Sequence, residues 1–165
     1  MLSGGGALGS LGGDPVGLVT VCLEWGFLEP WGVSLEAGLQ SLRTGADGPV
    51  IKASVLLQSA TLAIRRGFFT HGLDGFHLSL GFQLVRMSAG ATGTSDAHGV
   101  DVVAPAGAAS VDWRVTSKGG LFFLARFGAE VRQIQYFTVT GLAKPLVTVP
   151  PADFALELGA GWNFF

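Results

Sequence analysis

The last twelve residues, 154–165, read FALELGAGWNFF, and their pattern decides the fold class. Every second residue from Phe154 to Phe164 is apolar, and the residues between them include Glu157, Asn163 and two glycines. Alternation with a period of two indicates a β-strand that has one apolar face. Chain ends are normally frayed and polar, so a terminal strand this apolar, closed by two aromatic rings, needs an explanation from the rest of the chain.

The same alternation recurs in four further segments, and we predict a strand in each. They are VGLVTVCLEWGF (16–27), GVSLEAGLQS (32–41), FHLSLGFQL (76–84) and LFFLARFGAEVR (121–132).

Clusters of Gly, Pro and Asp, which favour tight reversals, separate these segments at 12–15, 28–30, 43–49, 65–75, 90–99, 117–120 and 140–145. Seven connections predict eight strands, of which the first is the glycine-rich segment 2–11 and the last is the opening stretch. The fourth, 50–64, alternates poorly, which leaves open that part of it is helical.

Composition narrows the class of protein. The 165 residues predict a single domain, 1–165. Only 13% of them are charged, about half the usual share, while 48% are apolar, which excludes disorder and is unusual for a soluble surface. The 26 glycines argue against long helices. A net charge of −2 without a basic run gives no reason to expect nucleic acid.

No stretch is apolar for long enough to predict a transmembrane helix, since the best candidate, 53–64, is short and carries Ser, Gln and Thr. Residues 1–15 lack the basic start and continuous apolar core of a signal peptide. We therefore expect either that a leader has been removed or that the chain is part of something longer. The single cysteine, Cys22, is expected to be a small strand residue, and it leaves the redox compartment open.

The two faces of the predicted strands differ in an informative way. The apolar face carries large and aromatic residues, whereas the polar face is rich in Gly, Ala and Ser and poor in charge. Small residues suit the crowded interior of an eight-stranded barrel, and large apolar residues suit a face that meets lipid. We therefore predict an all-β protein, an eight-stranded antiparallel up-and-down transmembrane β-barrel.

The charged residues of the polar face are nearly balanced, with five acids and four bases. Charges sealed in a narrow barrel must pair, because an isolated buried ion is very costly. We predict a plugged lumen; the alternative is that these are ordinary exposed charges of a soluble protein. The predicted lumen network is Glu24, Glu36, Lys52, Asp112, Arg114, Arg126, Glu130, Arg132 and Glu157.

Aromatic residues gather near the predicted strand ends. They are Trp25, Phe27 and Trp31, then Phe68, Phe69 and Phe76, and finally Trp162, Phe164 and Phe165. Such clusters are typical of the interfacial girdles of membrane barrels, although aromatic residues are also common in strands generally.

The whole pattern resembles the small eight-stranded outer-membrane β-barrels of Gram-negative bacteria, the class that includes the OmpA membrane domain, OmpX and OmpW. The most specific element is the terminal strand with Phe165 last. The resemblance implies that this strand faces lipid, pairs with the first strand, and carries in Trp162, Phe164 and Phe165 a signal for the barrel-assembly machinery. It also implies a monomer in the bacterial outer membrane, with lipid and that machinery as its partners.

Three features differ from the family pattern. Phe165 breaks the phase that Phe164 keeps. The first connection is shorter than the family's outer loops, and the fourth is longer than its periplasmic turns. Pro105 donates no backbone hydrogen bond, so a bulge or local break is expected there.

Motifs for chemistry are weak. The histidines lack metal-ligand spacing, no serine lies in a GxSxG motif, and the glycine-rich start lacks the lysine of a phosphate loop, so no metal or cofactor is expected. An enzyme remains the last alternative, with a loop site drawn from His71, His98, Asp74, Asp96 and Asp101.

The leading functional prediction is a structural or surface-exposed protein that maintains the envelope or presents outer loops, chiefly 43–49, 90–99 and 140–145. A narrow transporter of small hydrophobic molecules is the second hypothesis, and a soluble ligand-binding barrel the third. The transporter hypothesis depends on apolar residues assigned to the lumen phase, namely Leu56, Leu62, Phe122 and Leu124.

Overall fold

The computed structural model consists almost entirely of β-strands. It describes residues 2–11, 14–45, 52–71, 74–92, 100–117, 120–132, 135–137, 147–149 and 152–164, with side chains left out for 2–16, 28, 42–45, 52–53, 69–71, 91–92, 100, 135–137 and 147–149. The strands in this part of the chain are β1 (Leu2–Leu11), β2 (Asp14–Leu28), β3 (Trp31–Gly45), β4 (Lys52–His71), β5 (Asp74–Thr92), β6 (Val100–Thr116), β7 (Leu121–Arg132), β8 (Gln135–Phe137), β9 (Val147–Val149) and β10 (Ala152–Trp162). No helix among these residues is long and apolar enough to span a membrane.

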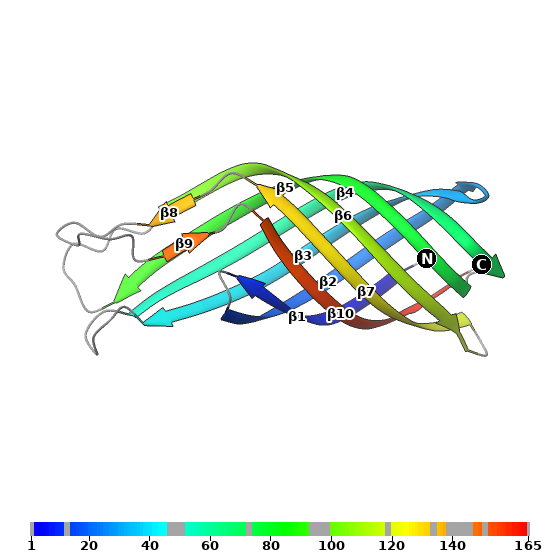
Figure 1. Ribbon diagram of the computed structural model, residues 1–165, viewed down its shortest axis with the longest axis horizontal. Coiled ribbons are helices and arrows are strands. Elements are labelled where there is room, and N and C mark those ends of the chain that lie inside the picture. Colours follow the sequence, from blue (N-terminus) through cyan, green and yellow to red (C-terminus); the bar gives the residue numbers. More distant parts are fainter. Residues whose placement is uncertain are drawn as a thin grey trace.

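Eight of the described strands close into one antiparallel barrel (Figure 1). Strands that follow one another along the chain pair, and β7 pairs with β10. The barrel closes where β10 also pairs with β1, with Leu2 opposite Trp162 and Ser10 opposite Phe154. The predicted eight-stranded up-and-down barrel is therefore confirmed, and the terminal strand lies in the wall between β1 and β7.

The barrel has two different ends (Figure 1). The terminal end carries both chain termini and the connections that follow β2, β4 and β6, whereas the loop end carries the other connections and the separate β8–β9 hairpin. The wall is uneven, since β4 and β5 have 20 and 19 residues and β1 and β10 only 10 and 11. The tall side of the wall therefore extends toward the loop end.

Side chains alternate strictly between the interior and the exterior. On β5, Leu80 is 59% exposed and Gln83 only 2%; on β10, Leu158 is 67% exposed and Glu157 only 5%. Large apolar side chains thus cover the outside, and most of the side chains that fill the inside are polar or small. This arrangement is the reverse of a soluble barrel and is typical of one that lies in lipid.

The terminal end carries a girdle of aromatic side chains on the exterior. All four tryptophans of the chain lie within four residues of a strand end there and are between 39% and 51% exposed. They are Trp25, Trp31, Trp113 and Trp162, and Phe27, Phe76 and Phe164 are exposed at the same end. The described exposed members of the predicted aromatic clusters therefore lie in one girdle at one end, and Phe69 and Phe165 lie outside the described side chains.

Two expectations about local structure were wrong. The predicted fourth strand is strand from 52 to 64, but β4 continues to His71, so only residues 72 and 73 separate it from β5 and the expected long fourth connection was wrong. The register of β5 with β6 runs through Pro105 without a shift, so there is no bulge or break. Pairing of β6 with β7 begins only at Ala106, so Pro105 lies beside a segment that β7 does not pair, where a missing N–H is tolerated.

The turn between β6 and β7 holds the end of the last strand. The backbone N–H of Asn163 donates a hydrogen bond to the carbonyl oxygen of Gly120 at 2.8 Å. Gly120 has a φ of +84°, and a Cβ at this position would lie 2.8 Å from the Asn163 oxygen. Glycine thus permits both the turn and its contact with the chain end.

Candidate functional site in the barrel lumen

The inward positions of the barrel strands bring polar side chains into a common interior. On β2 these are Thr20, Cys22 and Glu24, all of them at most 6% exposed. Because every strand contributes alternate residues to the same narrow space, groups far apart in sequence meet there. The charges form three clusters, from the terminal end toward the loop end.

The first cluster consists of Glu24, Arg65, Asp112 and Arg114, and each side chain is at most 7% exposed. The Arg114 guanidinium donates to Glu24 Oε2 at 2.9 Å and, through Nε, to Asp112 Oδ2 at 2.8 Å. Arg65 donates to the same Asp112 oxygen at 2.7 Å and also to Glu24. Two arginines and two carboxylates from three strands, β2, β4 and β6, thus form a closed, neutral ring of ion pairs.

Two neighbours cover the first cluster. The ring of Phe122, which is fully buried, lies 5.0 Å from the guanidinium carbon of Arg114 in a cation–π contact. The Nδ1 atom of His77 lies 3.7 Å from Asp112 Oδ2. The aromatic ring of Phe122 therefore lies against one face of the Arg114 guanidinium.

The second cluster is centred on Arg126 of β7. Its guanidinium donates to Glu36 and reaches Glu157 Oε2 at 3.4 Å, and the hydroxyl of Thr20 donates to the other oxygen of Glu157. Glu36 is the most exposed member, with a side chain that is 25% exposed.

The third cluster lies nearest the loop end. Arg132 donates to Glu130 Oε2 and to Asp153 Oδ2, both at 3.2 Å. The amide groups of Gln83 and Gln40 donate to the same two acids, at 2.9 and 3.5 Å. Each carboxylate of the three clusters therefore has an arginine partner, as a low-dielectric interior requires.

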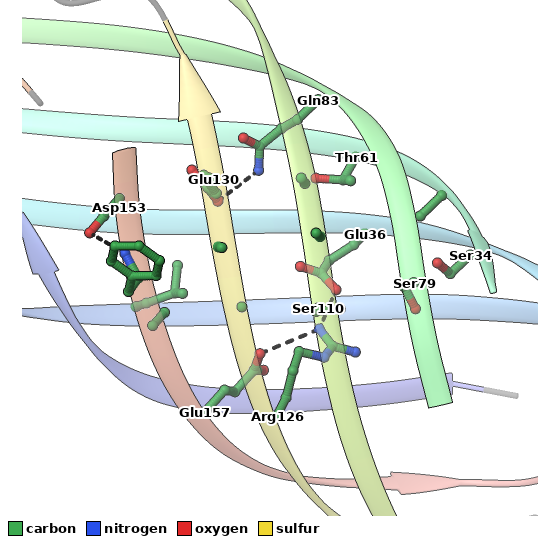
Figure 2. Close-up of a pocket in the computed structure, with 18 of the residues that line it drawn as sticks. Ser34, Glu36, Thr61, Ser79, Gln83, Ser110, Arg126, Glu130, Asp153 and Glu157 are labelled. Atoms are coloured by element: carbon green, nitrogen blue, oxygen red, sulfur yellow. Dashed lines mark hydrogen bonds and ion pairs between the residues drawn. The ribbon is translucent and has the colours of Figure 1, made fainter. Parts of the chain in front are cut away.

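A cavity of about 70 Å³ lies between the second and third clusters. Figure 2 shows Glu36, Gln83, Arg126 and Glu130 around this space. Two buried atoms beside it, Gln83 Oε1 and Arg126 Nε, have no hydrogen-bond partner within the described protein. The cavity is polar and has room for a few water molecules, at about 30 Å³ each, which would satisfy these atoms.

The structure describes the side chains of eight of the nine residues predicted for the lumen network, and all eight lie in the three clusters. The ninth, Lys52, lies in β4, and its side chain is outside the described residues, so its place in the network stays a prediction. The lumen phase assigned to Leu62 was wrong, because this side chain is 61% exposed, and Leu56 has the same strand phase.

Sequence reasoning missed two lumen charges, Arg65 and Asp153. Arg65 was assigned to a turn, although it lies in β4 opposite Gly32 of β3. Asp153 is the second residue of β10, opposite Glu130 of β7, and its even distance from Glu157 was a signal that could have identified it. Of the other apolar residues assigned to the lumen, Phe122 and Leu124 do point inward and are 0% and 5% exposed.

Of the residues proposed for a loop enzyme, only Asp74 and Asp101 have described side chains, and these two lie apart. Asp74 accepts a hydrogen bond from the backbone of Thr116 at the terminal end, whereas Asp101 pairs with Arg86 toward the loop end. The side chain of His71, and all of Asp96 and His98, lie outside the described residues. Within the described part of the chain, no three His, Cys, Asp or Glu side chains group as metal ligands.

At the end of the chain, Trp162 and Phe164 project outward and are 47% and 61% exposed. Both keep the exterior phase that runs from Phe154 along β10. Phe165 lies outside the described residues.

No protein-family model and no curated protein matches the sequence. Solved structures do match it. Ail, the attachment invasion locus protein of Yersinia pestis, is similar with a TM-score of 0.61 at 14% identity, over 98% of this chain and 95% of Ail. A second structure of Ail, in complex with the heparin analogue sucrose octasulfate, has a TM-score of 0.56 at 13% identity, over 98% of this chain and 95% of that one.

Neisserial surface protein A (NspA) is similar with a TM-score of 0.55 at 11% identity, over 99% of this chain and 94% of NspA. Both neighbours are small outer-membrane β-barrel proteins of Gram-negative bacteria. The match extends over nearly the whole chain in both directions. The chain therefore has the fold of the small outer-membrane β-barrels of Gram-negative bacteria.

Proposed function

We propose that this protein is a surface-exposed barrel of the bacterial outer membrane whose plugged lumen gives the envelope a rigid element and presents outer loops for interaction. The observation that carries the proposal is the continuity of the three charge clusters across the interior. Their arginines are at most 9% exposed, and the space left between them is about 70 Å³. A lumen filled in this way serves stability and not conduction.

The exterior supports the membrane location. Exposed Leu, Val, Ile and Phe side chains cover the outside of β2 to β7 and β10, and a tryptophan girdle marks the terminal end. In bacterial barrels of this fold the short turns face the periplasm and the longer connections face outward. The connections predicted as outer loops, 43–49, 90–99 and 140–145, all belong to the loop end. We assign that end to the cell surface.

Partners follow from the same assignment. The exterior apolar surface would contact outer-membrane lipid, and the closed wall leaves no unpaired barrel strand for association, so a monomer is expected. The aromatic chain end, Trp162, Phe164 and Phe165, would be read by the barrel-assembly machinery. A catalytic role is not part of the proposal. Leu56 and Leu62 do not support a transporter of small hydrophobic molecules, because they have the exterior phase.

The proposal is tested by folding the protein into detergent and then into a planar bilayer. We expect a band that migrates faster in a gel before boiling than after it, strand-type circular dichroism, and no stepwise conductance. The double variant Arg126→Ala/Glu157→Ala removes the second cluster beside the cavity and should introduce small conductance steps. Regular channel openings in the wild-type protein would contradict a plugged lumen.

The surface assignment needs a test of its own. A cysteine placed between 93 and 99 in a Cys22→Ser background should react with a membrane-impermeant maleimide on intact cells. A cysteine in place of Glu29, in the turn at the terminal end, should react only after the cells are lysed. The opposite result would reverse the orientation.

A further inference from the structure

Among the arginines whose side chains are described, Arg66 is the one whose charge no carboxylate of the described residues matches. Its neighbour Arg65 points into the lumen and pairs with Glu24 and Asp112. The other arginines with described side chains, Arg86, Arg114, Arg126 and Arg132, each lie within 4.0 Å of a carboxylate. Arg66 has no such ion pair among the described residues, and it is exposed on the outside of β4.

Two aromatic rings hold the Arg66 side chain. Its guanidinium carbon lies 5.1 Å from the ring centroid of Trp31, the cross-strand partner on β3, and 4.9 Å from that of Phe68 on its own strand. Cation–π contacts engage the face of the planar guanidinium and order it, but they bring no opposite charge. The N–H edge of the group, which suits the bidentate binding of an oxyanion, is not occupied by a carboxylate.

The position of Arg66 determines which anion it can meet. It lies at the terminal end of the exterior band, directly beyond Leu62 and Ile64, which are 61% and 57% exposed. The exposed tryptophan girdle of the same end marks the level of the lipid headgroups. The anion present at this level is the phosphodiester of a phospholipid, and a charged side chain left unmatched beside hydrocarbon is costly.

We propose that Arg66, held between Trp31 and Phe68, forms a binding site for the phosphodiester group of a phospholipid in the leaflet at the terminal end of the barrel. This inference rests on the proposed membrane location. The guanidinium edge donates two hydrogen bonds to the phosphate oxygens, and the rings lie beside the upper acyl chains. The site binds one lipid beside strands β3 and β4.

Arg86 provides a matched control, because it is also an exposed arginine on the exterior of a neighbouring strand. Its guanidinium is occupied by Asp101, with contacts of 3.0 and 3.1 Å from Nε and 2.5 Å from Nη2. Arg86→Gln therefore removes the same charge from the outside of the barrel. It does not remove a guanidinium that is available to bind phosphate, because Asp101 already accepts the hydrogen bonds of Arg86.

The first test is native mass spectrometry of the detergent-folded protein titrated with phosphatidylglycerol. We expect Arg66→Gln to weaken retention of one lipid by about tenfold, as loss of a charged hydrogen-bonded contact implies, and Arg86→Gln to leave retention unchanged. Equal retention by the wild-type protein and Arg66→Gln, or equal loss in both variants, overturns the proposal. Displacement of the lipid by millimolar sodium phosphate would instead identify a site for free phosphate and would also overturn it.

A second measurement needs no substitution. In bilayers of phosphatidylglycerol, the guanidinium carbon that correlates with a tryptophan ring should lose ¹³C signal by dipolar coupling to lipid ³¹P. A barrel that folds, as judged by its fast-migrating unboiled band, but shows no such coupling overturns the lipid site alone. A protein that does not enter the bilayer at all overturns the proposed membrane location.

Discussion

Among single residues, the lumen charges of the first cluster depend most on one another. Glu24 accepts hydrogen bonds from Arg65 and Arg114, and its side chain is 6% exposed. Removing one member of such a set leaves a buried charge without compensation, which costs more than the pair contributes. The energetic importance of the cluster therefore lies in its completeness.

We expect Glu24→Gln to lower the free energy of unfolding by about 3–5 kcal/mol, because it leaves two arginines facing one carboxylate. The measurement is a urea titration of the protein folded into lipid vesicles, followed by tryptophan fluorescence. Asp101→Asn is the control, since it breaks an ion pair whose side chains are about half exposed, and we expect it to lower the free energy of unfolding much less than Glu24→Gln does. Equal losses in the two variants would contradict the sealed cluster.

Alanine substitutions at two glycines of the wall are expected to have opposite effects on stability. A Cβ on Gly81, which lies on the inward side of β5, would be 2.7 Å from the Ala63 Cβ and from the Leu62 carbonyl oxygen, whereas a Cβ on Gly107 of β6 would meet nothing within 4 Å. We expect Gly81→Ala to cost about 1–3 kcal/mol, as overpacking does, and Gly107→Ala to be neutral or stabilising. The same vesicle titration measures both, and a tolerant Gly81 would show that the interior is loosely filled.

Among the strands, alternation predicted most of the wall correctly. The phases of β2, β3, β5, β7 and β10 follow from large apolar residues on one side and small or polar residues on the other. Alternation does not predict which face of β4 points inward, because Val55 and Leu57 point inward while Leu62 and Ile64 point outward. Both of its faces are apolar in sequence, so only pairing with β3 and β5 decides the phase.

The adjacent arginines of β4 show the same limit. Consecutive residues of a strand must point to opposite sides, so one of Arg65 and Arg66 enters the lumen and the other faces outward. Nothing local selects between them. Arg65 points inward because the acids Glu24 and Asp112 of other strands lie there.

The role of the aromatic end of β10 in assembly can be tested separately from its role in stability. If the aromatic end of β10 is the signal read by the assembly machinery, then removing Phe165 together with Phe164→Ala should sharply reduce the amount of barrel in the outer membrane of cells. Refolding of the purified variant into detergent should change little, because the Phe164 side chain is 61% exposed. An equal defect in both settings would mean that these residues stabilise the fold and do not signal.

For the whole molecule, the closed barrel and its apolar exterior were predictable from the sequence. Which charged side chains pair with one another in the lumen was not. The balance of charge predicted a filled lumen, yet the contacts join residues 90 positions apart, as in Glu24 with Arg114, or 137 apart, as in Thr20 with Glu157. Such contacts depend on strand stagger and on closure between β1 and β10, which no short segment encodes. The same limitation hid the partners of Arg65 and Asp153.

The central claim is that this barrel presents its apolar side to lipid and its charged side to a sealed interior. The most direct measurement compares single cysteines at Leu80 and Gln83 in a Cys22→Ser background, each carrying a spin label and folded into lipid vesicles. Leu80 is 59% exposed and Gln83 is 2% exposed beside the cavity. We expect the label at Leu80 to collide freely with oxygen dissolved in the bilayer and the label at Gln83 to be shielded from it. Equal oxygen accessibility at the two sites would contradict the account.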